Sequence, residues 1–370
     1  TPAVPGLLRA IEARREAVEA DPGLRATMLP DGRPLGAGDA LLQPALAATL
    51  HELADDPGSF YRGPVAERLA AGLRALGSAI DADDLAAHEV ERPEPLSAEL
   101  AGVRWWAAPP PSQGATALAL LDPEIPGDLL ARARDAHDAR RRLLGDPRGG
   151  PIDVAGMRRP APAHGPAVPA PPATGDTVAV TAVDEEGRSV VLIQSVFQTF
   201  GAGILEPTTG IVLHNRGATF VLDAEHPAAL GPGRRPPHTL CPLLGEGPGV
   251  RVALGCQGGR AQPLILAQVA AATADPDTDL RDALAVPRWV VGDRDLGFAA
   301  EAVLAEAGAA VPPGSGLEVV AGGLHEDRCG HVQAARATAA GLEAAADPRA
   351  DGRAAVVHPS TDPVDPRSSS

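Results

Sequence analysis

The sequence predicts an α+β protein built around a β-hairpin in the middle of the chain. From Thr177 to Val183 the side chains alternate between two faces, the chain turns at 184–187, and a second apolar strand follows over 189–193. Apolar residues at helical spacing recur near the start of the chain and again after residue 262. Because both faces of the hairpin carry apolar side chains, we expect both to be mostly buried.

Helices and strands are separated by clear turn signals along the rest of the chain. Asp39 and the acidic group at 81–84 are expected to cap helices. The apolar patterns predict helices at about 7–20, 40–53, 64–76, 82–88, 115 onward, 126–144 and 262–274, and strands at 101–107, 211–213 and 250–254. The Pro/Ala-rich tract at 160–172 favours polyproline II or a simple linker, and the tail from 357 is expected to be disordered.

The threonine that opens the hairpin is the candidate nucleophile. A hydrolase with an N-terminal nucleophile needs a Thr, Ser or Cys at the start of a central strand, because the freed amine of that residue acts as the base for its own side chain. Thr177 holds this position and Asp176 precedes it. We therefore expect the chain to cleave itself between Asp176 and Thr177.

Several motifs of the chain resemble the gamma-glutamyltransferase family, in the family's order and close to its spacings. Those of its small subunit are Gly175-Asp176-Thr177, Gln194-Ser195, Phe200-Gly201-Ala202-Gly203-Ile204, Asn215-Arg216-Gly217, Arg235-Pro236, Gly258-Gly259 and Ala285-Val286-Pro287-Arg288-Trp289. Those of its large subunit are Gly38-Asp39-Ala40-Leu41-Leu42-Gln43-Pro44, Phe60-Tyr61-Arg62-Gly63, Asp84-Leu85-Ala86-Ala87 and Pro109-Pro110-Pro111-Ser112-Gln113-Gly114. The resemblance implies a four-layer αββα sandwich of the N-terminal nucleophile hydrolase type. Residues 1–176 would be the large-subunit part and 177–370 the small-subunit part of one αββα unit.

The resemblance also implies catalytic roles for three residues besides Thr177. Gly258 and Gly259 would supply the oxyanion-hole donors, while a tight turn without a catalytic role is the alternative. A phosphate-binding loop is disfavoured because the sequence contains no lysine. Ser195 would hydrogen-bond the nucleophile, or else merely satisfy a neighbouring strand.

The substrate clamps of glutathione-cleaving members are replaced in this chain. Phe197 and Thr219 align with the pair that holds the α-amino group, and His238 and Thr239 align with the serine pair that holds the α-carboxylate. An amino-acid head group bound here would lose its charge partners, which is costly in a closed site. We therefore do not expect glutathione to be the physiological substrate.

The segment Asn215-Arg216-Gly217 resembles the acylase and amidohydrolase branch of the family instead. The guanidinium of Arg216 suits a substrate carboxylate, and an ion pair with Asp223 or Glu225 is an equal alternative. His238 is expected either to hydrogen-bond the acyl group or to pack as a core histidine.

In the family a further segment precedes the Val-Pro-Gly motif that stands here at 4–6. That segment contributes sheet strands and an arginine that clamps the substrate's α-carboxylate. The chain begins at the motif, so we expect its sheet to be incomplete. An incomplete sheet would have an open edge and an exposed apolar face.

Charge and composition exclude several classes of partner. The formal net charge of −16 argues against nucleic acid, and the one basic run, Arg140-Arg141-Arg142, is expected to be the solvated end of a helix. No apolar run reaches the roughly 18–20 residues of a membrane span. The first residues lack a signal-peptide pattern, which favours the cytoplasm over secretion. The three cysteines suggest buried free thiols, and no histidine spacing indicates a metal site, so no cofactor is expected.

These observations predict a self-processing amidohydrolase or acyltransferase. It would cleave a gamma-glutamyl or related acyl amide, in a small molecule or a peptide, through a threonine ester. Its partners would be the large and small chains of its own precursor, and the sequence leaves homo-oligomerisation open. The competing interpretation is an unprocessed or catalytically impaired relative that acts as a binding or scaffold protein.

Overall fold

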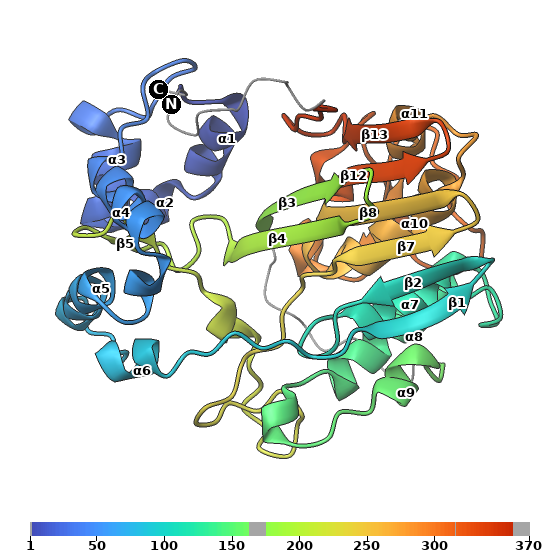
Figure 1. Cartoon of the computed structure of the whole chain (residues 1–370), viewed down its shortest axis with the longest axis horizontal. Coiled ribbons are helices and arrows are strands. Elements are labelled where there is room, and N and C mark those ends of the chain that lie inside the picture. Colours follow the sequence, from blue (N-terminus) through green and yellow to red (C-terminus); the bar gives the residue numbers. More distant parts are fainter. Residues whose placement is uncertain (1, 163–174, 315, 358–370) are drawn as a thin grey trace.

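The computed structural model describes residues 2–162, 175–314 and 316–357 and has the predicted α+β composition (Figure 1). The helices are α1 (Pro5–Ala13), α2 (Arg15–Ala20), α3 (Pro22–Met28), α4 (Pro44–Asp55), α5 (Pro64–Ala75), α6 (Ala82–Ala86), α7 (Gly114–Leu121), α8 (Leu129–Leu143), α9 (Val154–Arg158), α10 (Gln262–Ala274) and α11 (Leu280–Ala285). The strands are β1 (Leu96–Leu100), β2 (Val103–Ala107), β3 (Gly175–Val183), β4 (Ser189–Gln198), β5 (Leu205–Glu206), β6 (Ile211–Val212), β7 (Leu243–Gly247), β8 (Val250–Gln257), β9 (Trp289–Gly292), β10 (Ala302–Ala305), β11 (Glu318–Ala321), β12 (His331–Thr338) and β13 (Gly341–Ala346). Most of the Pro/Ala tract and nearly all of the tail lie outside the described residues.

Local sequence explains most of the helix boundaries, with two corrections. Proline occupies an early position of α4 and α5, where its fixed φ favours a helix start, and Asp81 forms a capping box with Asp84 at α6. The expected helix at 7–20 breaks at Arg14 into α1 and α2. Asp39 caps no helix, because its carboxylate accepts a hydrogen bond from the N–H of Gly36 in a turn and α4 begins only afterwards.

The main layer is a six-stranded antiparallel sheet in the order β1-β2-β7-β8-β12-β13. Its β2 and β7 strands pair directly, so residues on both sides of Thr177 in the sequence share one sheet. Helices α7 and α10 pack against one face and enclose the largest apolar core with residues such as Leu118, Leu254 and Ile265. None of the helices in the described part of the chain is long and apolar enough to cross a bilayer.

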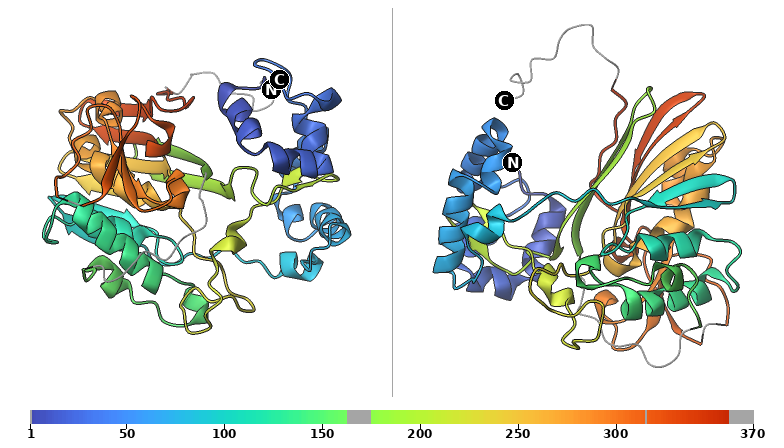
Figure 2. Two further views of the ribbon diagram at one scale, coloured as in Figure 1. Left: turned by 180° about the vertical axis from the view of Figure 1, so that it is seen from behind. Right: turned by 60° about the horizontal axis from the view of Figure 1, so that its bottom comes forward.

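The β3–β4 hairpin forms a second sheet layer on the other face (Figure 2). It approaches β8 so closely that a Cβ added to Gly255 would lie 2.8 Å from the Cβ of Ala179, so glycine is required there. The expectation that both faces of the hairpin are mostly buried is wrong. The outer face exposes Val178, Val180, Val190 and Leu192, with exposed fractions of 53–61%. Among the described residues, no layer buries these side chains.

The N-terminal helices lie beside the end of the hairpin at which β3 begins (Figures 1 and 2). Thr177 is in the first part of β3, so it lies at this end. Phe200 and Leu205, just beyond β4, are buried in a cluster with Ile11, Val18 and Leu24 of α1–α3. This packing anchors the loop after β4 to the first helices and fixes one wall of the region around Thr177.

A buried network of four charged side chains links the segment after β13 to the core. Glu306 and Asp347 accept hydrogen bonds from the guanidinium of Arg349, and Asp347 also accepts from Arg288. The side chains of all four residues are fully buried. Because a charge left alone in such a site is strongly unfavourable, the four residues depend on each other.

Glu306→Gln is expected to lower the free energy of unfolding by about 3–5 kcal/mol, since it leaves the buried guanidinium groups of Arg349 and Arg288 to share the single carboxylate of Asp347. Burial raises the pKa of Glu306, but the hydrogen bonds from Arg349 and from the Arg288 N–H outweigh it, so the pKa is lowered overall. A lowered carboxyl pKa contributes stability above the unfolded value of about 4.3, and this is lost as the pH falls through the folded pKa. Urea unfolding at several pH values tests this. The exposed Glu318→Gln variant is the control, and equal stabilities of the two variants would contradict the prediction.

Candidate active site

Thr177 lies where the register of the hairpin changes. Asp176 pairs with Phe197, whereas Thr177 pairs with Ser195, so Val196 is left over on β4 and the ladder is irregular between Asp176 and Thr177. Phe197 has a φ of 78°, which is uncommon for a residue with a side chain. Such bulges redirect side chains and are frequent beside active sites. The predicted cleavage site therefore coincides with the irregular point of the hairpin.

Ser195 is the centre of the hydrogen bonds around Thr177. The two hydroxyl oxygens lie 3.0 Å apart and share a hydrogen bond. Ser195 Oγ also accepts from the N–H of Phe197 at 2.9 Å and from Nη2 of Arg216 at 3.2 Å. A hydroxyl accepts two hydrogen bonds and donates one. With both acceptor positions filled, the hydrogen of Ser195 is left to donate to Thr177.

Arg216 is buried and has only neutral partners among the described residues. Its Nη1 donates to Thr239 Oγ1 at 3.1 Å, its Nη2 donates to Ser195, and its guanidinium carbon lies 4.4 Å from the ring centre of Phe197. Burial lowers the pKa of Arg216 to about 10, so it remains charged near neutral pH. The alternative of an ion pair with Asp223 or Glu225 is contradicted, because the structure forms neither pair. A buried cation without a carboxylate partner is suited to bind an anion.

The other aligned residues support Arg216 rather than surround an open pocket. Thr219 Oγ1 lies 2.8 Å from the carbonyl oxygen of Arg216 and 2.7 Å from that of Pro237, and its single hydrogen donates to one or the other. The side-chain carbonyl of Asn215 accepts from the N–H of Gln198 at 3.1 Å. Together with Thr239, Asn215 and Thr219 therefore fix the loop that carries Arg216.

The side chains of His238 and Arg140 lie close to one another and to Arg216. Burial, and then the charges of Arg216 and Arg140, lower the pKa of His238 to about 4, so its ring is neutral near neutral pH. Its buried Nδ1 has no partner among the described residues. The expectation that Arg140-Arg141-Arg142 is the solvated end of a helix holds in part. The run ends α8 and the Arg142 side chain is 52% exposed, whereas burial lowers the pKa of Arg140 to about 9, and its Nε is buried without a partner in the described chain. Packing of α8 against β9 encloses this side of the helix. Two cations thus lie near the neutral ring of His238.

Gly258 and Gly259 form a tight turn between β8 and α10. Both have positive φ values, of 151° and 53°. A Cβ on Gly258 would lie 2.4 Å from Cδ1 of Ile265, which leaves no room for a side chain. The carbonyls of Gly259 and Thr239 both accept from the buried Nε2 of Gln113, at 3.0 and 2.5 Å. Gln113 thus ties the glycine turn to the loop beside Arg216.

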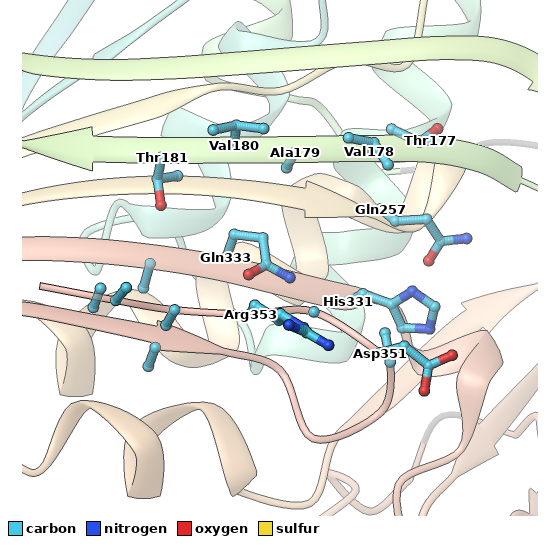
Figure 3. A pocket seen from close by; sticks show the side chains of 17 residues that line it. Thr177, Val178, Ala179, Val180, Thr181, Gln257, His331, Gln333, Asp351 and Arg353 are labelled. Carbon is cyan, nitrogen blue, oxygen red and sulfur yellow. The ribbon is translucent and has the colours of Figure 1, made fainter. Parts of the chain in front are cut away.

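Two cavities open beside Thr177. One, of about 540 Å³, is lined by Thr177 and Gly258 together with residues of α1 and of the segments around 294–297 and 327–331. The other, of about 480 Å³, lies between β3, β12 and the segment 350–355 (Figure 3). Of the ten predicted catalytic and substrate-binding residues, all of which the structure describes, only Thr177 and Gly258 line these two cavities. Ser195, Arg216, Phe197 and Thr239 reach Thr177 through the hydrogen bonds and the ring contact described above.

Both cavities contain polar residues that the sequence patterns did not single out as site residues. Gln257, His331 and Asp351 line each of them, and Figure 3 shows their side chains on the side facing Thr177. His331 Nε2 lies 2.7 Å from Asp327 Oδ1. The spacing Asp-x-x-x-His was a visible signal for this pair, but it indicates a contact only when the two residues lie on one turn.

The cysteines do not contribute a nucleophile. Cys241, Cys256 and Cys329 are free and buried, as predicted. Burial raises the pKa of each thiol, to about 12 for Cys241 and Cys329. In the described part of the chain, no group of three or more His, Cys, Asp or Glu side chains is arranged to hold a metal ion.

Comparison with known proteins identifies the family. The family model described as gamma-glutamyltranspeptidase matches residues 2–123 and 135–357. The chain belongs to this family. It is therefore an enzyme of the N-terminal nucleophile hydrolase type with amidohydrolase or acyltransferase chemistry, and the predicted α+β sandwich class is confirmed.

The most informative relatives are amidohydrolases and acylases. The chain is 35% identical to the oxamate amidohydrolase proenzyme of Klebsiella pneumoniae, over 94% of this chain and 71% of that protein. It is 30% identical to the glutathione hydrolase-like YwrD proenzyme of Bacillus subtilis, over 86% and 66%. Among solved structures, the cephalosporin acylase from Bacillus halodurans superposes with a TM-score of 0.80 at 26% identity, over 97% and 72%. The likeness to the acylase and amidohydrolase branch is thus confirmed.

Ser195→Ala is expected to slow cleavage before Thr177 by roughly ten- to a hundred-fold, because a hydrogen bond to a developing charge contributes about 1.5–3 kcal/mol. The cleaved fraction is measured over time by mass spectrometry under denaturing conditions. Ser189→Ala, at the far end of the same strand, is the control. Cleavage of Ser195→Ala at the wild-type rate would show that Ser195 only satisfies the strand.

Proposed function

We propose that the protein is a self-processing amidohydrolase for small amides that carry a carboxylate beside the reacting carbonyl, the class to which oxamate belongs. Thr177 is the nucleophile in this proposal, and Arg216 receives the carboxylate. The observation that carries it is the chain of two hydrogen bonds from Thr177 through Ser195 to Arg216. Because the two hydrogen bonds are 3.0 and 3.2 Å long, a substrate whose carboxylate and amide carbonyl are close together suits this site.

The shortness of this chain argues against a gamma-glutamyl substrate. In such a substrate, several carbon atoms separate the α-carboxylate from the reacting amide, whereas in an oxamate-like substrate the two carbonyl carbons are bonded directly. The buried guanidinium has two N–H groups that point to neutral hydroxyls, which a carboxylate can replace as the stronger acceptor. The first relative acts on such a compound by its name, which agrees with this choice.

Self-cleavage begins when Thr177 Oγ attacks the carbonyl carbon of Asp176. The C–N bond breaks as the ester forms, and water then cleaves the ester, which releases the carboxylate of Asp176 and the α-amine of Thr177. The reference pKa of an α-amine is about 7.7–8.0, which suits a base near neutral pH. The irregular ladder at Asp176 favours the required turning of this peptide away from the strand.

In the mature enzyme, the α-amine of Thr177 takes the hydroxyl proton while Oγ attacks the substrate amide. The N–H groups of Gly258 and Gly259 stabilise the oxyanion, and the leaving amine departs with the proton from the α-amine. Water then hydrolyses the threonine ester. Ser195 donates to Thr177 Oγ throughout, so it stabilises negative charge on this oxygen as the proton leaves.

Cleavage divides the chain into residues 1–176 and 177–370 in this proposal, and the two parts stay associated. The β2–β7 pairing, the bonds of Gln113 to Thr239 and Gly259, and the burial of Phe200 among α1–α3 all cross the cut. These contacts are part of the core, so separation would expose it to water.

The first test compares intact masses of wild type, Thr177→Ala and Thr177→Ser under denaturing conditions. The wild type is expected to give two fragments, the second beginning at Thr177, and Thr177→Ala one uncut chain. Thr177→Ser is expected to be cut, because it keeps a hydroxyl. An uncut wild type, after long incubation, would contradict self-processing and favour a binding or scaffold role.

The second test measures selectivity. Arg216→Ala is expected to lower kcat/KM for oxamate by roughly 30-fold or more, because the substrate carboxylate loses its buried partner. The neutral diamide oxamide should lose much less, so the ratio of the two kcat/KM values falls. Arg68→Ala, on α5, is the control. An unchanged ratio in Arg216→Ala would exclude Arg216 as the carboxylate receptor.

A further inference from the structure

A further, smaller cavity lies between α8 and the end of β9. It has a volume of about 40 Å³, and its lining includes His137, Arg140 and Arg141 of α8 and Arg260, which directly follows Gly259. Positions 137, 140 and 141 are three and four residues apart, so these side chains lie on the same side of the helix. None of the four residues lines the two cavities beside Thr177.

Three nitrogen atoms of the residues that line this cavity are buried without a hydrogen-bond partner in the described chain. They are Nε2 of His137, Nε of Arg140 and Nε of Arg260. Buried polar groups in native proteins almost always have a partner, which is a protein group, an ordered water or an ion. Both arginine atoms are N–H donors. Burial, and then the nearby arginine charges, lower the pKa of His137 to about 3, so its ring is neutral and one tautomer donates from Nε2.

Arg140 is the cation of this cavity whose charge is left without a counterion. Its guanidinium forms no ion pair with a carboxylate in the described part of the chain. Burial is the main cause that lowers its pKa to about 9, and the charges of Arg260, Arg216 and Arg141 act in the same direction. Arg140 therefore stays charged near neutral pH although it lies among other cations. A buried charge of this kind is costly unless a counterion compensates it.

The carboxylates that line the cavity already contact other arginines, at N–O distances of 2.8–3.3 Å. The pairs are Asp293 and Asp295 with Arg260, and Glu301 with Arg134. Asp295 also raises the pKa of Arg140, but burial and the other arginines lower it more. Arg141 is paired too, with Asp138 of α8 at 2.9 Å. The charge of Arg140 thus remains uncompensated after these pairs have formed.

We propose that this cavity binds one small monovalent anion, of the class of chloride, between His137, Arg140 and Arg260. Its volume of about 40 Å³ exceeds the roughly 10–15 Å³ that one water needs and is far below the roughly 300 Å³ of the smallest typical ligand pockets. An anion accepts hydrogen bonds and donates none, so it matches a lining whose unpartnered groups are donors. A water in its place would leave the charge of Arg140 uncompensated.

The position of the site gives the anion a structural use. His137 and Arg140 precede Thr177 in the chain, whereas Arg260 and the residues of β9 follow it. One anion would therefore join the two parts of the chain that self-cleavage separates. Because Arg260 directly follows the two glycines, the same contact would restrain their turn. The site itself needs no cleavage, since the uncut chain contains all of its residues.

The test is a chloride titration of the Tm at constant ionic strength, in which sodium chloride replaces sodium gluconate stepwise. Gluconate is too large for the cavity. The proteins are wild type, Arg140→Met, His137→Phe and the control Arg142→Met, which changes a residue of the same helix that is 52% exposed. We expect about 150 mM chloride to raise the Tm of wild type by about 2 °C or more, because a ligand that binds only the folded state stabilises it. Arg142→Met should respond as wild type does.

Arg140→Met separates anion binding from a purely structural role of the arginine. Without the buried charge, the variant should be at least as stable as wild type in gluconate, and its Tm should not respond to chloride. His137→Phe keeps a ring but loses the N–H, so its response should be smaller than that of wild type. Equal shifts in wild type and both cavity variants, or no shift in wild type, would overturn the inference. The uncut Thr177→Ala should show the wild-type shift, so a failure of self-cleavage leaves this test intact.

Discussion

The structure depends on the register of the β3–β4 hairpin against the main sheet. Ala179, beside Gly255, fixes how the inner face of the hairpin lies on β8. That placement sets Thr177 opposite Ser195 and leaves Val196 as the irregular residue. A shift by one residue would send Thr177 to the exposed outer face, because side chains alternate along a strand. The position of the hydroxyl is therefore determined by packing several residues away.

The sequence predicted the elements whose signal is local. The hairpin, α5, α10 and the capping box at Asp81 follow from period and capping residues. The bounds of α5 and α10 agree with the expected ones to within one residue, whereas β4 continues to Gln198, five residues past its expected end. The family motifs led to Thr177, Ser195 and the two glycines. The geometry adds that Ser195 is bonded to both Thr177 and Arg216, which no one-dimensional pattern contains.

What the sequence could not supply depends on contacts between distant segments. The sequence pattern of an alternating strand is the same whether or not another layer covers its outer face. The sequence therefore did not predict the exposure of Val180 and Leu192. The neutral surroundings of Arg216 come from residues at 195, 197 and 239, and Asp223 was only its neighbour in sequence. His331 was discounted as a metal ligand, and its closeness to Thr177 appears only when β12 is paired with β8.

The pairing of β2 with β7 has a practical consequence for how the enzyme can be made. Each strand is the hydrogen-bonding partner of the other, so a fragment expressed without its counterpart would present a row of unpaired backbone groups. If the two fragments were expressed separately, each would therefore have an incomplete sheet with an aggregation-prone edge, and the fragments would not recombine on mixing. Permuted or split versions should keep β2 and β7 on one polypeptide until folding is complete.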